Sequence, residues 1–272
     1  MPRSVVEQVV VVKVATWNIN GLKARLNFLR LFLDERQPDL VGLQELKMTD
    51  AVFPHEFFAE LGYTAVSHGQ KSWNGVAVLS RLPMATVQVG LPGQDDLGAR
   101  LLHVRVADAL DFITVYCPNG KTLEHPDYQR KLAWYGAFAE YLQAHTSSKA
   151  TTLVGGDFNV VPTPQDSWRG ADGTGNLFCT ESERNALQAL YDLGLHDLYR
   201  GAFPDRTEFS WWDYRGGAFP RDQGLRIDFL LGTQAVAVNT AKVYIDREYR
   251  KKHNGLTASD HAPVIAELAA LK

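Results

Sequence analysis

The sequence has few cysteines, no long apolar segment and no excess of positive charge. Its two cysteines, Cys117 and Cys179, lack metal-ligand spacing, and Cys117 lies in an apolar run, which is typical of a buried reduced thiol. No apolar run approaches the length of a membrane span, and the burst at 9–12 is too short for a signal sequence. We therefore expect a soluble, cytoplasmic protein without a membrane partner.

The net charge of −3 and the isoelectric point of about 6.2 provide no global basic field of the kind that attracts nucleic acid. A nucleic-acid enzyme of this composition needs a local basic patch and a cation at its acidic centre. Basic residues that lie close in sequence to the polar motifs described below could supply such a patch: Lys23, Arg25, Lys47, Lys71 and Lys121.

The length of 272 residues suits one large domain, and no linker or change in composition divides the chain. Residues 1–272 are therefore predicted to form a single domain, with a core of about 11–268. Strands are predicted at 9–16, 40–44, 75–80, 101–106, 112–116, 151–155, 227–231 and 264–268, and helices at 23–34, 126–143 and 182–193, the last beginning near Ser182. This alternation indicates an α/β fold with a layered sheet core. The stretch 162–180 is predicted to be a long ordered loop.

Five short polar motifs are spread along the chain: WNINGL, LQELK, GGDFNVVPT, LRIDFLL and SDHAPV. Strand interiors disfavour Asp, Asn and Glu, and a buried carboxylate is costly unless it is paired or binds a metal. We therefore expect one shared site at strand ends, formed by Asn18, Glu45, Asp157, Asn159, Asp228, Asp260 and His261. Carboxylate and amide oxygens together with an imidazole suit Mg²⁺ or Mn²⁺ and a phosphate.

Each motif taken alone has a simpler interpretation. Asp157 and Asn159 lie two apart in an extended segment, so both can face one phosphate, but they could also close a turn. Glu45 follows an apolar strand either as a metal ligand or as a solvated charge. Asn18 belongs either to the metal or phosphate shell or to a helix cap. Their occurrence together favours the functional interpretation.

Asp228 lies among apolar residues, and His261 is its natural partner, because an Asp bonded to one imidazole nitrogen stabilises the protonated ring. The alternative is a structural pair that locks two strands together. Tyr116 and Asn119 in YCPNG would add neutral donors near a phosphate, although the Pro-Asn-Gly tripeptide alone favours a turn. The aromatic block FSWWDYR, at 209–215, suits either base stacking or a core edge.

Taken in order, these motifs resemble the exonuclease III family of abasic-site endonucleases, in the endonuclease/exonuclease/phosphatase superfamily: WNINGL, LQELK, YCPNG, GGDFNVVPT, FSWWDYR, GLRIDFLL and SDHAPV. The resemblance implies a four-layered α/β sandwich like that of deoxyribonuclease I, with two packed mixed sheets flanked by helices and a site at one edge. It also implies that Glu45 is the principal metal ligand, with Asn18 near the metal and Asp260 as an auxiliary ligand.

The resemblance implies roles for the other positions as well. Asp157 is similar to the residue that activates water or supports the leaving group, and Asp228 and His261 are similar to the family's acid–imidazole pair. Phosphate contacts are implied for Asn159, Tyr116 and Asn119, and a pocket for a flipped-out sugar without its base is implied for Trp211, Leu225 and Ile227.

The family resemblance implies that the protein is a monomeric, Mg²⁺- or Mn²⁺-dependent DNA repair nuclease. It would cut double-stranded DNA 5′ to abasic sites and leave a 3′-hydroxyl, with 3′→5′ exonuclease and 3′-end-cleaning activity. Alternatives are mainly a 3′→5′ exonuclease, a phosphatase acting on another phosphoester, or a non-catalytic DNA-binding scaffold. The sequence departs from some relatives at 121–128, where DNA-intercalating residues are not reproduced, and at Asn20, where an acid would support a second metal.

Overall fold

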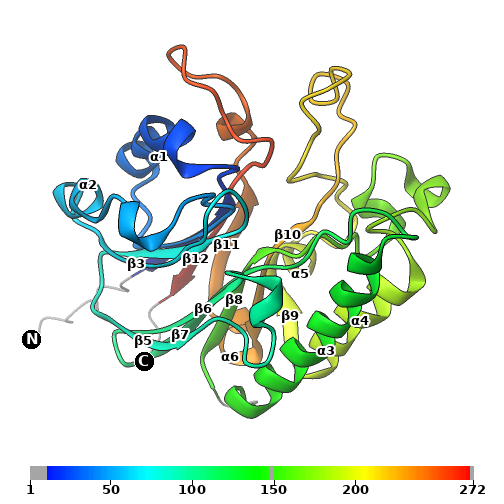
Figure 1. The fold of residues 1–272 in the computed structure, drawn as a ribbon, viewed down its shortest axis with the longest axis horizontal. Coiled ribbons are helices and arrows are strands. Elements are labelled where there is room, and N and C mark those ends of the chain that lie inside the picture. Colours follow the sequence, from blue (N-terminus) through cyan, green and yellow to red (C-terminus); the bar gives the residue numbers. More distant parts are fainter. Residues whose placement is uncertain (1–10, 148–149, 270–272) are drawn as a thin grey trace, which may run out of the picture.

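Two packed β-sheets form the centre of the molecule in a computed structural model that describes residues 11–147 and 150–269 (Figure 1). The strand order is β11-β12-β1-β2-β4-β3 in the first sheet and β5-β6-β7-β8-β10-β9 in the second. The strands are β1 Val11–Asn18, β2 Leu40–Gln44, β3 Thr64–His68, β4 Val76–Ser80, β5 Met84–Val89, β6 Leu101–Val106, β7 Leu110–Tyr116, β8 Thr152–Asp157, β9 Leu195–Asp197, β10 Asp228–Thr233, β11 Thr240–Ile245 and β12 Val264–Ala269. Both sheets are mixed, because β1 runs parallel to β2 and β7 runs parallel to β8.

Helices cover the outer faces of the two sheets, which gives the predicted four layers (Figure 1). The helices are α1 Leu22–Arg36, α2 His55–Glu60, α3 Pro126–His145, α4 Glu181–Asp192, α5 Leu198–Ala202 and α6 Gln234–Val238, with 3₁₀ turns η1 Asp50–Val52, η2 Asp95–Leu97, η3 Pro164–Asp166, η4 Gly170–Gly173 and η5 Arg247–Arg250. Trp17 on β1 packs with Phe28 and Phe32 of α1, whereas Trp134 and Phe138 of α3 lie in the core beneath the second sheet. No helix in the described part of the chain is long and apolar enough to cross a membrane.

Strand prediction succeeded in the sheet interiors and failed at the sheet edges. All eight predicted runs form strands, although residues 9 and 10 of the first lie outside the described part. The four strands without a prediction are β3, β5, β9 and β11, which are the four edge strands. They are largely half-buried or exposed, so their sequences lack the apolar runs of the inner strands.

The predicted start of α4 at Ser182 lies one position after the observed first residue, Glu181. The N-cap is Thr180, whose hydroxyl accepts from the Glu183 N–H while the Glu183 carboxylate accepts from the Thr180 N–H. This reciprocal capping box satisfies two backbone donors at once, which a start at Ser182 would not achieve. The preceding stretch, 162–180, is an ordered loop as predicted, and it contains η3 and η4.

Small residues and one polar cluster set the distance between the two sheets. A Cβ atom on Gly42 would lie 2.7 Å from Thr114 Oγ1 of the opposite sheet, and one on Gly155 would lie 3.2 Å from Thr16 Cβ of the opposite sheet. Beside this contact the buried Gln44 side chain donates to Thr16 Oγ1 at 2.9 Å and to Thr114 Oγ1 at 2.8 Å. The sheets therefore approach closely under the strand ends, and a polar link joins them there.

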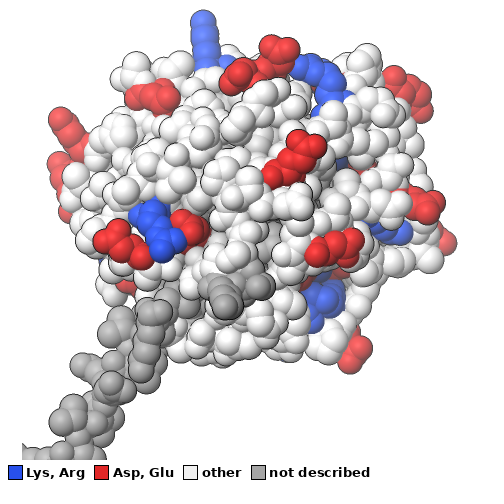
Figure 2. All heavy atoms as spheres, turned by 90° about the horizontal axis from the view of Figure 1, so that it is seen from below, with Lys and Arg blue, Asp and Glu red and all other residues white. Residues whose placement is uncertain are grey.

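The face drawn in Figure 2 carries lysine, arginine, aspartate and glutamate side chains in scattered positions. Neither the basic nor the acidic side chains form a continuous patch on the described residues visible there. Any positive surface for an anionic substrate therefore belongs to another face.

Gly42→Ala is expected to lower the free energy of unfolding by about 1–3 kcal/mol, because the new methyl group overpacks the contact with Thr114. The matched control is Gly136→Ala in α3, where a Cβ meets nothing within 4 Å. That change should stabilise by about 0.4–1 kcal/mol. Urea denaturation measures both, and equal effects of the two substitutions would contradict the proposed tight contact.

Candidate active site

The topology brings the predicted polar residues to one edge of the two sheets. In the second sheet Tyr116 ends β7 opposite Asp157 at the end of β8, and Asp157 lies opposite Asp228 at the start of β10. In the first sheet Asn18 ends β1 and Glu45 directly follows β2, its parallel neighbour. His261 lies three residues before β12, which pairs with β1. Residues far apart in sequence therefore meet because their strands end together.

His261 lies between two buried aspartates. Its Nδ1 atom is 2.9 Å from Asp228 Oδ2, and its Nε2 atom is 3.8 Å from Asp157 Oδ2. The Ser210 hydroxyl donates to Asp228 Oδ2 at 2.6 Å and holds this carboxylate in place. Burial alone would lower the pKa of His261, but Asp228, Asp157 and Asp260 outweigh it and raise the pKa to about 10. The imidazole is therefore a cation at neutral pH.

Asp157 is a buried carboxylate at the centre of the site. Burial and the nearby charge of Asp228 raise its pKa to about 7, against the opposing effects of His261 and the Asn18 amide. Asn18 Nδ2 donates to Asp157 Oδ2 at 2.9 Å and to Glu45 Oε1 at 3.1 Å, so one amide orients both carboxylates. A carboxylate whose pKa lies near neutrality can take up and release a proton under ordinary conditions.

Glu45 is half-buried and surrounded by donors. The Tyr116 hydroxyl donates to Glu45 Oε1 at 2.7 Å, and the Lys47 ammonium lies 2.9 Å from Oε2. Burial would raise the pKa of Glu45, but Lys47 and Tyr116 outweigh it and lower the pKa, so the carboxylate is ionised. Lys47 Nζ also donates to Asn20 Oδ1 at 2.5 Å. The Lys47 ammonium thus lies between the Glu45 carboxylate and the Asn20 amide oxygen. Oxygen donors of these two kinds also suit Mg²⁺ or Mn²⁺.

Asp260 joins this group through its neighbours. Asn20 Nδ2 donates to Asp260 Oδ1 at 2.8 Å, and Trp211 Nε1 donates to Oδ2 at 3.0 Å. A second possible metal group consists of Asp157, Asp228 and His261, whose ligand atoms lie within 4.8 Å of one another. A metal there would have to displace the proton from a strongly basic imidazole, so the oxygen donors around Glu45 fit the ion better.

The two predicted phosphate amides differ in their surroundings. Asn159 is buried with a left-handed φ of 50°, and its N–H donates to Asp157 Oδ1 at 3.0 Å. Asn119 is exposed, and its amide donates to Asn159 Oδ1 at 3.4 Å. Both therefore border the carboxylate cluster, one inside it and one at its mouth, beside a cleft of about 740 Å³ that Glu45, Tyr116 and Asn119 help to line.

An apolar cluster adjoins the carboxylates on the other side. It contains the three residues predicted to line a pocket, Trp211, Leu225 and Ile227, together with Val161, Phe178 and Cys179. Trp211 pairs through β-bridges with both Leu225 and His261, and the centre of its ring lies 6.5 Å from that of the His261 ring. The structure thus brings all twelve predicted site residues to one region.

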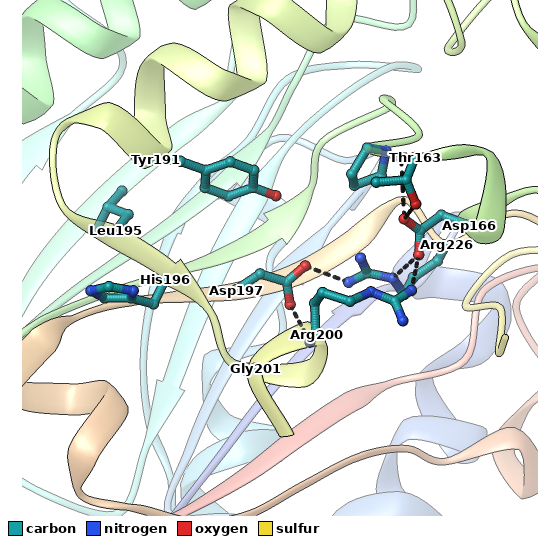
Figure 3. A pocket seen from close by; sticks show the side chains of 10 residues that line it. Thr163, Asp166, Tyr191, Leu195, His196, Asp197, Arg200, Gly201 and Arg226 are labelled. Atoms are coloured by element: carbon teal, nitrogen blue, oxygen red, sulfur yellow. Dashed lines mark hydrogen bonds and ion pairs between the residues drawn. The ribbon is translucent and has the colours of Figure 1, made fainter. Parts of the chain in front are cut away.

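A buried ion network fixes the loop that covers this cluster (Figure 3). The Arg226 guanidinium lies 2.6 Å from Asp166 of η3 and 2.6 Å from Asp197 of β9, and Arg200 lies 2.5 Å from Asp166. The backbone N–H of Arg226 also donates to the backbone carbonyl of Asp166 at 2.9 Å. Figure 3 shows these four side chains converging at one end of a pocket of about 420 Å³, with Tyr191 and Leu195 on its far side.

Several contributing residues lacked a prediction. Ser210, which orients Asp228, lies inside the aromatic block, and a serine there carries no sequence signal of its own. The sequence predicts Lys47 only as part of a local basic patch, yet it bridges Glu45 and Asn20. Lys131 interrupts an apolar face of α3, and a lysine at a core position was the signal that could have found it.

Two mixed sheets that present buried carboxylates, an imidazolium and an ionised glutamate at one edge define a phosphodiester hydrolase of the deoxyribonuclease I-like type. The family model described as "Endonuclease/Exonuclease/phosphatase family" matches residues 15–261. The chain belongs to this family.

The similar proteins place it in the exonuclease III branch, whose members are phosphodiesterase nucleases. The chain is 34% identical to exodeoxyribonuclease III of Haemophilus influenzae, over 94% of this chain and 99% of that protein. A Neisseria 3′ phosphatase bound to a product DNA hairpin superimposes with a TM-score of 0.91 at 36% identity, over 95% of this chain and 100% of that one. An AP endonuclease of Archaeoglobus fulgidus does so with a TM-score of 0.90 at 32% identity, over the same shares of the two chains.

Asp228→Asn is expected to lower the pKa of His261 from about 10 by at least about one unit, because the main charge that raises it is lost. In the metal-free wild type the folded pKa exceeds the ordinary value of 6.5. The stability that His261 contributes is therefore complete below pH 6.5 and is lost as pH rises toward 10, and the variant should lose it earlier.

An NMR titration of the His261 ring measures this pKa, and urea denaturation across the same pH range measures the stability. Asp192→Asn, an equal charge change on the exposed side of α4, is the control and should leave the ring unaffected. An unchanged His261 pKa in Asp228→Asn would contradict the pairing.

Proposed function

We propose that this nuclease hydrolyses DNA phosphodiesters 5′ to abasic sites and leaves a 3′-hydroxyl, with Mg²⁺ or Mn²⁺ as cofactor. The observation that carries the proposal is the placement of the Asp157–His261–Asp228 group directly beside the apolar cluster around Trp211. The Asp157–His261–Asp228 group would supply the hydrolytic chemistry, and the apolar cluster would supply a pocket for a sugar without a base. A monomer in the cytoplasm remains a prediction from the sequence.

Proton transfer at the attacking or leaving oxygen is assigned to Asp157. Its raised pKa, about 7, supports either accepting a proton from water or supporting the leaving group. His261 stays protonated and neutralises charge that builds on the phosphate oxygens, while Asp228 fixes the ring through Nδ1. This division of roles follows from environments that push the two groups toward different charge states.

Neutral donors are assigned to the phosphate oxygens. The Tyr116 phenol stays protonated because burial, and then Glu45 and Asp157, raise its pKa, so it remains a donor. Asn159 and Asn119 present amides at the bottom and mouth of the site. Fixed donors of this kind are most effective where charge develops in the transition state, and they need no reorganisation during the reaction.

The metal is assigned to Glu45, with Asn18 and Asp260 beside it and Asn20 as a further oxygen donor. When bound, it would supply positive charge at the phosphate and orient the substrate. Lys47 would then have to leave its position between Glu45 and Asn20.

Specificity for an abasic nucleotide is assigned to the pocket of Trp211, Leu225 and Ile227. An abasic sugar leaves the helix at less than the cost of a few kcal/mol that an intact base requires. DNA affinity is assigned to the side of the site where a pocket of about 600 Å³ is lined by three lysines and no acid: Lys23, Lys47 and Lys71. This local patch supports DNA binding despite the negative net charge.

A second candidate, mainly 3′-end processing, is supported by the likeness to the Neisseria 3′ phosphatase bound to a DNA hairpin. Both reactions would use the same catalytic group and differ in how the DNA lies across it.

A duplex oligonucleotide with one synthetic abasic site, incubated with Mg²⁺ or with EDTA, tests the proposal. The wild type should cut 5′ to the site only with metal, and Asp157→Ala should lose at least about 100-fold in rate. Degradation from 3′ ends alone would identify the second candidate. No reaction at either the abasic site or the 3′ ends would contradict a DNA function.

Glu45→Gln is expected to weaken Mn²⁺ binding by at least about 10- to 100-fold, because even indirect partners of a metal have effects of that size. Isothermal titration calorimetry measures the affinity independently of activity. Glu60→Gln, at the exposed end of α2, removes the same charge elsewhere and should bind Mn²⁺ like the wild type. Equal affinities of the two variants would overturn the assignment.

A further inference from the structure

A fully buried lysine lies directly behind the proposed phosphate-binding residues. Lys131 lies on the inner face of α3 among Tyr128, Trp134 and Tyr135, and its side chain has 0% exposure. Burying an ammonium group among aromatic rings is costly unless acceptors surround it. The contacts of its Nζ atom show where the compensation comes from.

Lys131 Nζ reaches the backbone of both phosphate-binding asparagines. It donates to the Asn159 carbonyl at 2.7 Å and, less closely, to the Asn119 carbonyl at 3.4 Å. Asn159 has a φ of 50°, a left-handed conformation that asparagine adopts more readily than most other residues. In this conformation the Asn159 N–H faces Asp157 Oδ1, and its side-chain amide donates to the Cys117 carbonyl at 2.9 Å. The ammonium therefore secures the turn that orients both Asp157 and Asn159.

The charge of Lys131 is balanced from the opposite side by Glu183 on α4. Glu183 Oε1 lies 2.5 Å from Lys131 Nζ, and its other oxygen accepts from the N–H and hydroxyl of Thr180. Lys131 Nζ also lies 4.9 Å from the centre of the Phe178 ring. One ion pair thus connects α3, α4, the turns after β7 and β8, and the end of the long loop.

We propose that Lys131 is a positioning residue for phosphodiester hydrolysis, which acts through the Asn159 carbonyl to hold Asn159 and Asp157 in their reactive arrangement. The inference rests on the proposed role of Asn159 as a phosphate ligand. Lys131 itself does not touch substrate, because it is enclosed by protein.

A variant that keeps the fold is needed, because removing one member of a buried ion pair leaves the other uncompensated. Lys131→Met combined with Glu183→Gln removes both charges, and glutamine can still accept from Thr180 in the capping box. We expect this double variant to melt near the wild-type temperature. Its kcat should fall by about 10- to 100-fold, the scale of a small misplacement of catalytic groups, with KM within about twofold.

A double-mutant cycle with Asn159→Ala separates positioning from a general structural effect. If Lys131 acts through Asn159, adding the Lys131→Met and Glu183→Gln changes to Asn159→Ala should slow the enzyme less than they slow the wild type, because the Asn159 side chain is already gone and only the backbone hold on Asp157 remains to be lost. The proposal would be overturned if the rate losses of Asn159→Ala and of the Lys131/Glu183 variant simply multiplied in the combined variant. A wild-type kcat in either of these two variants would overturn it as well.

Leu190→Ala is the matched stability control. It removes buried apolar packing from the same helix and leaves the hydrogen bonds of Thr180, Glu183 and Lys131 in place, so it should lower the melting temperature and leave kcat unchanged. A rate loss in Leu190→Ala equal to that of the Lys131/Glu183 variant would overturn the proposal. Rates are measured on the abasic duplex and on 3′ ends, so that failure of the proposed incision remains distinguishable from failure of this inference.

Discussion

The arrangement of the site depends on the burial of two carboxylates beside a single imidazolium. Asp157 and Asp228 belong to the second sheet, whereas His261 precedes a strand of the first, so their attraction also joins the two sheets at this edge. The imidazolium favours the ionised form of Asp157, and the neighbouring aspartates keep the ring protonated. Catalytic charge and the packing of the two sheets are therefore parts of one interaction.

The contact between the sheets behind this group is unusually close. Gly42 and Gly155 allow the backbones to approach, and Gln44 spans the gap to hydroxyl groups on both sides. Because Gln44 is paired with Asn18 in register, a shift of β2 against β1 would displace Glu45 relative to Asn18. The polar link therefore penalises slippage in the strands whose ends carry residues proposed to bind the metal and the phosphate.

The sequence supported accurate prediction wherever burial leaves a pattern. Inner strands are continuous apolar runs, and the functional carboxylates stand out because they interrupt or end those runs, as Asp157 and Asp228 do. Edge strands such as β5 bury too little to leave such a signal. Ser210 and Lys131 could not be assigned, because their roles depend on which distant atoms the fold brings within reach. The start of α4 was misplaced because Thr180 caps it through a residue three positions later.

The wide separation of the site residues along the chain has a consequence for the nuclease during its own synthesis. Asn18 and Glu45 emerge from the ribosome early, but β1 lacks its partner β12, and Asp157 lacks its cation, until residue 261 and the strand after it have followed. Pairing of such distant segments is slow, since the ends of the long stretch of chain between them must first come together. Because the proposed hydrolytic group includes His261, we expect the nascent polypeptide to lack nuclease activity until β12 pairs with β1.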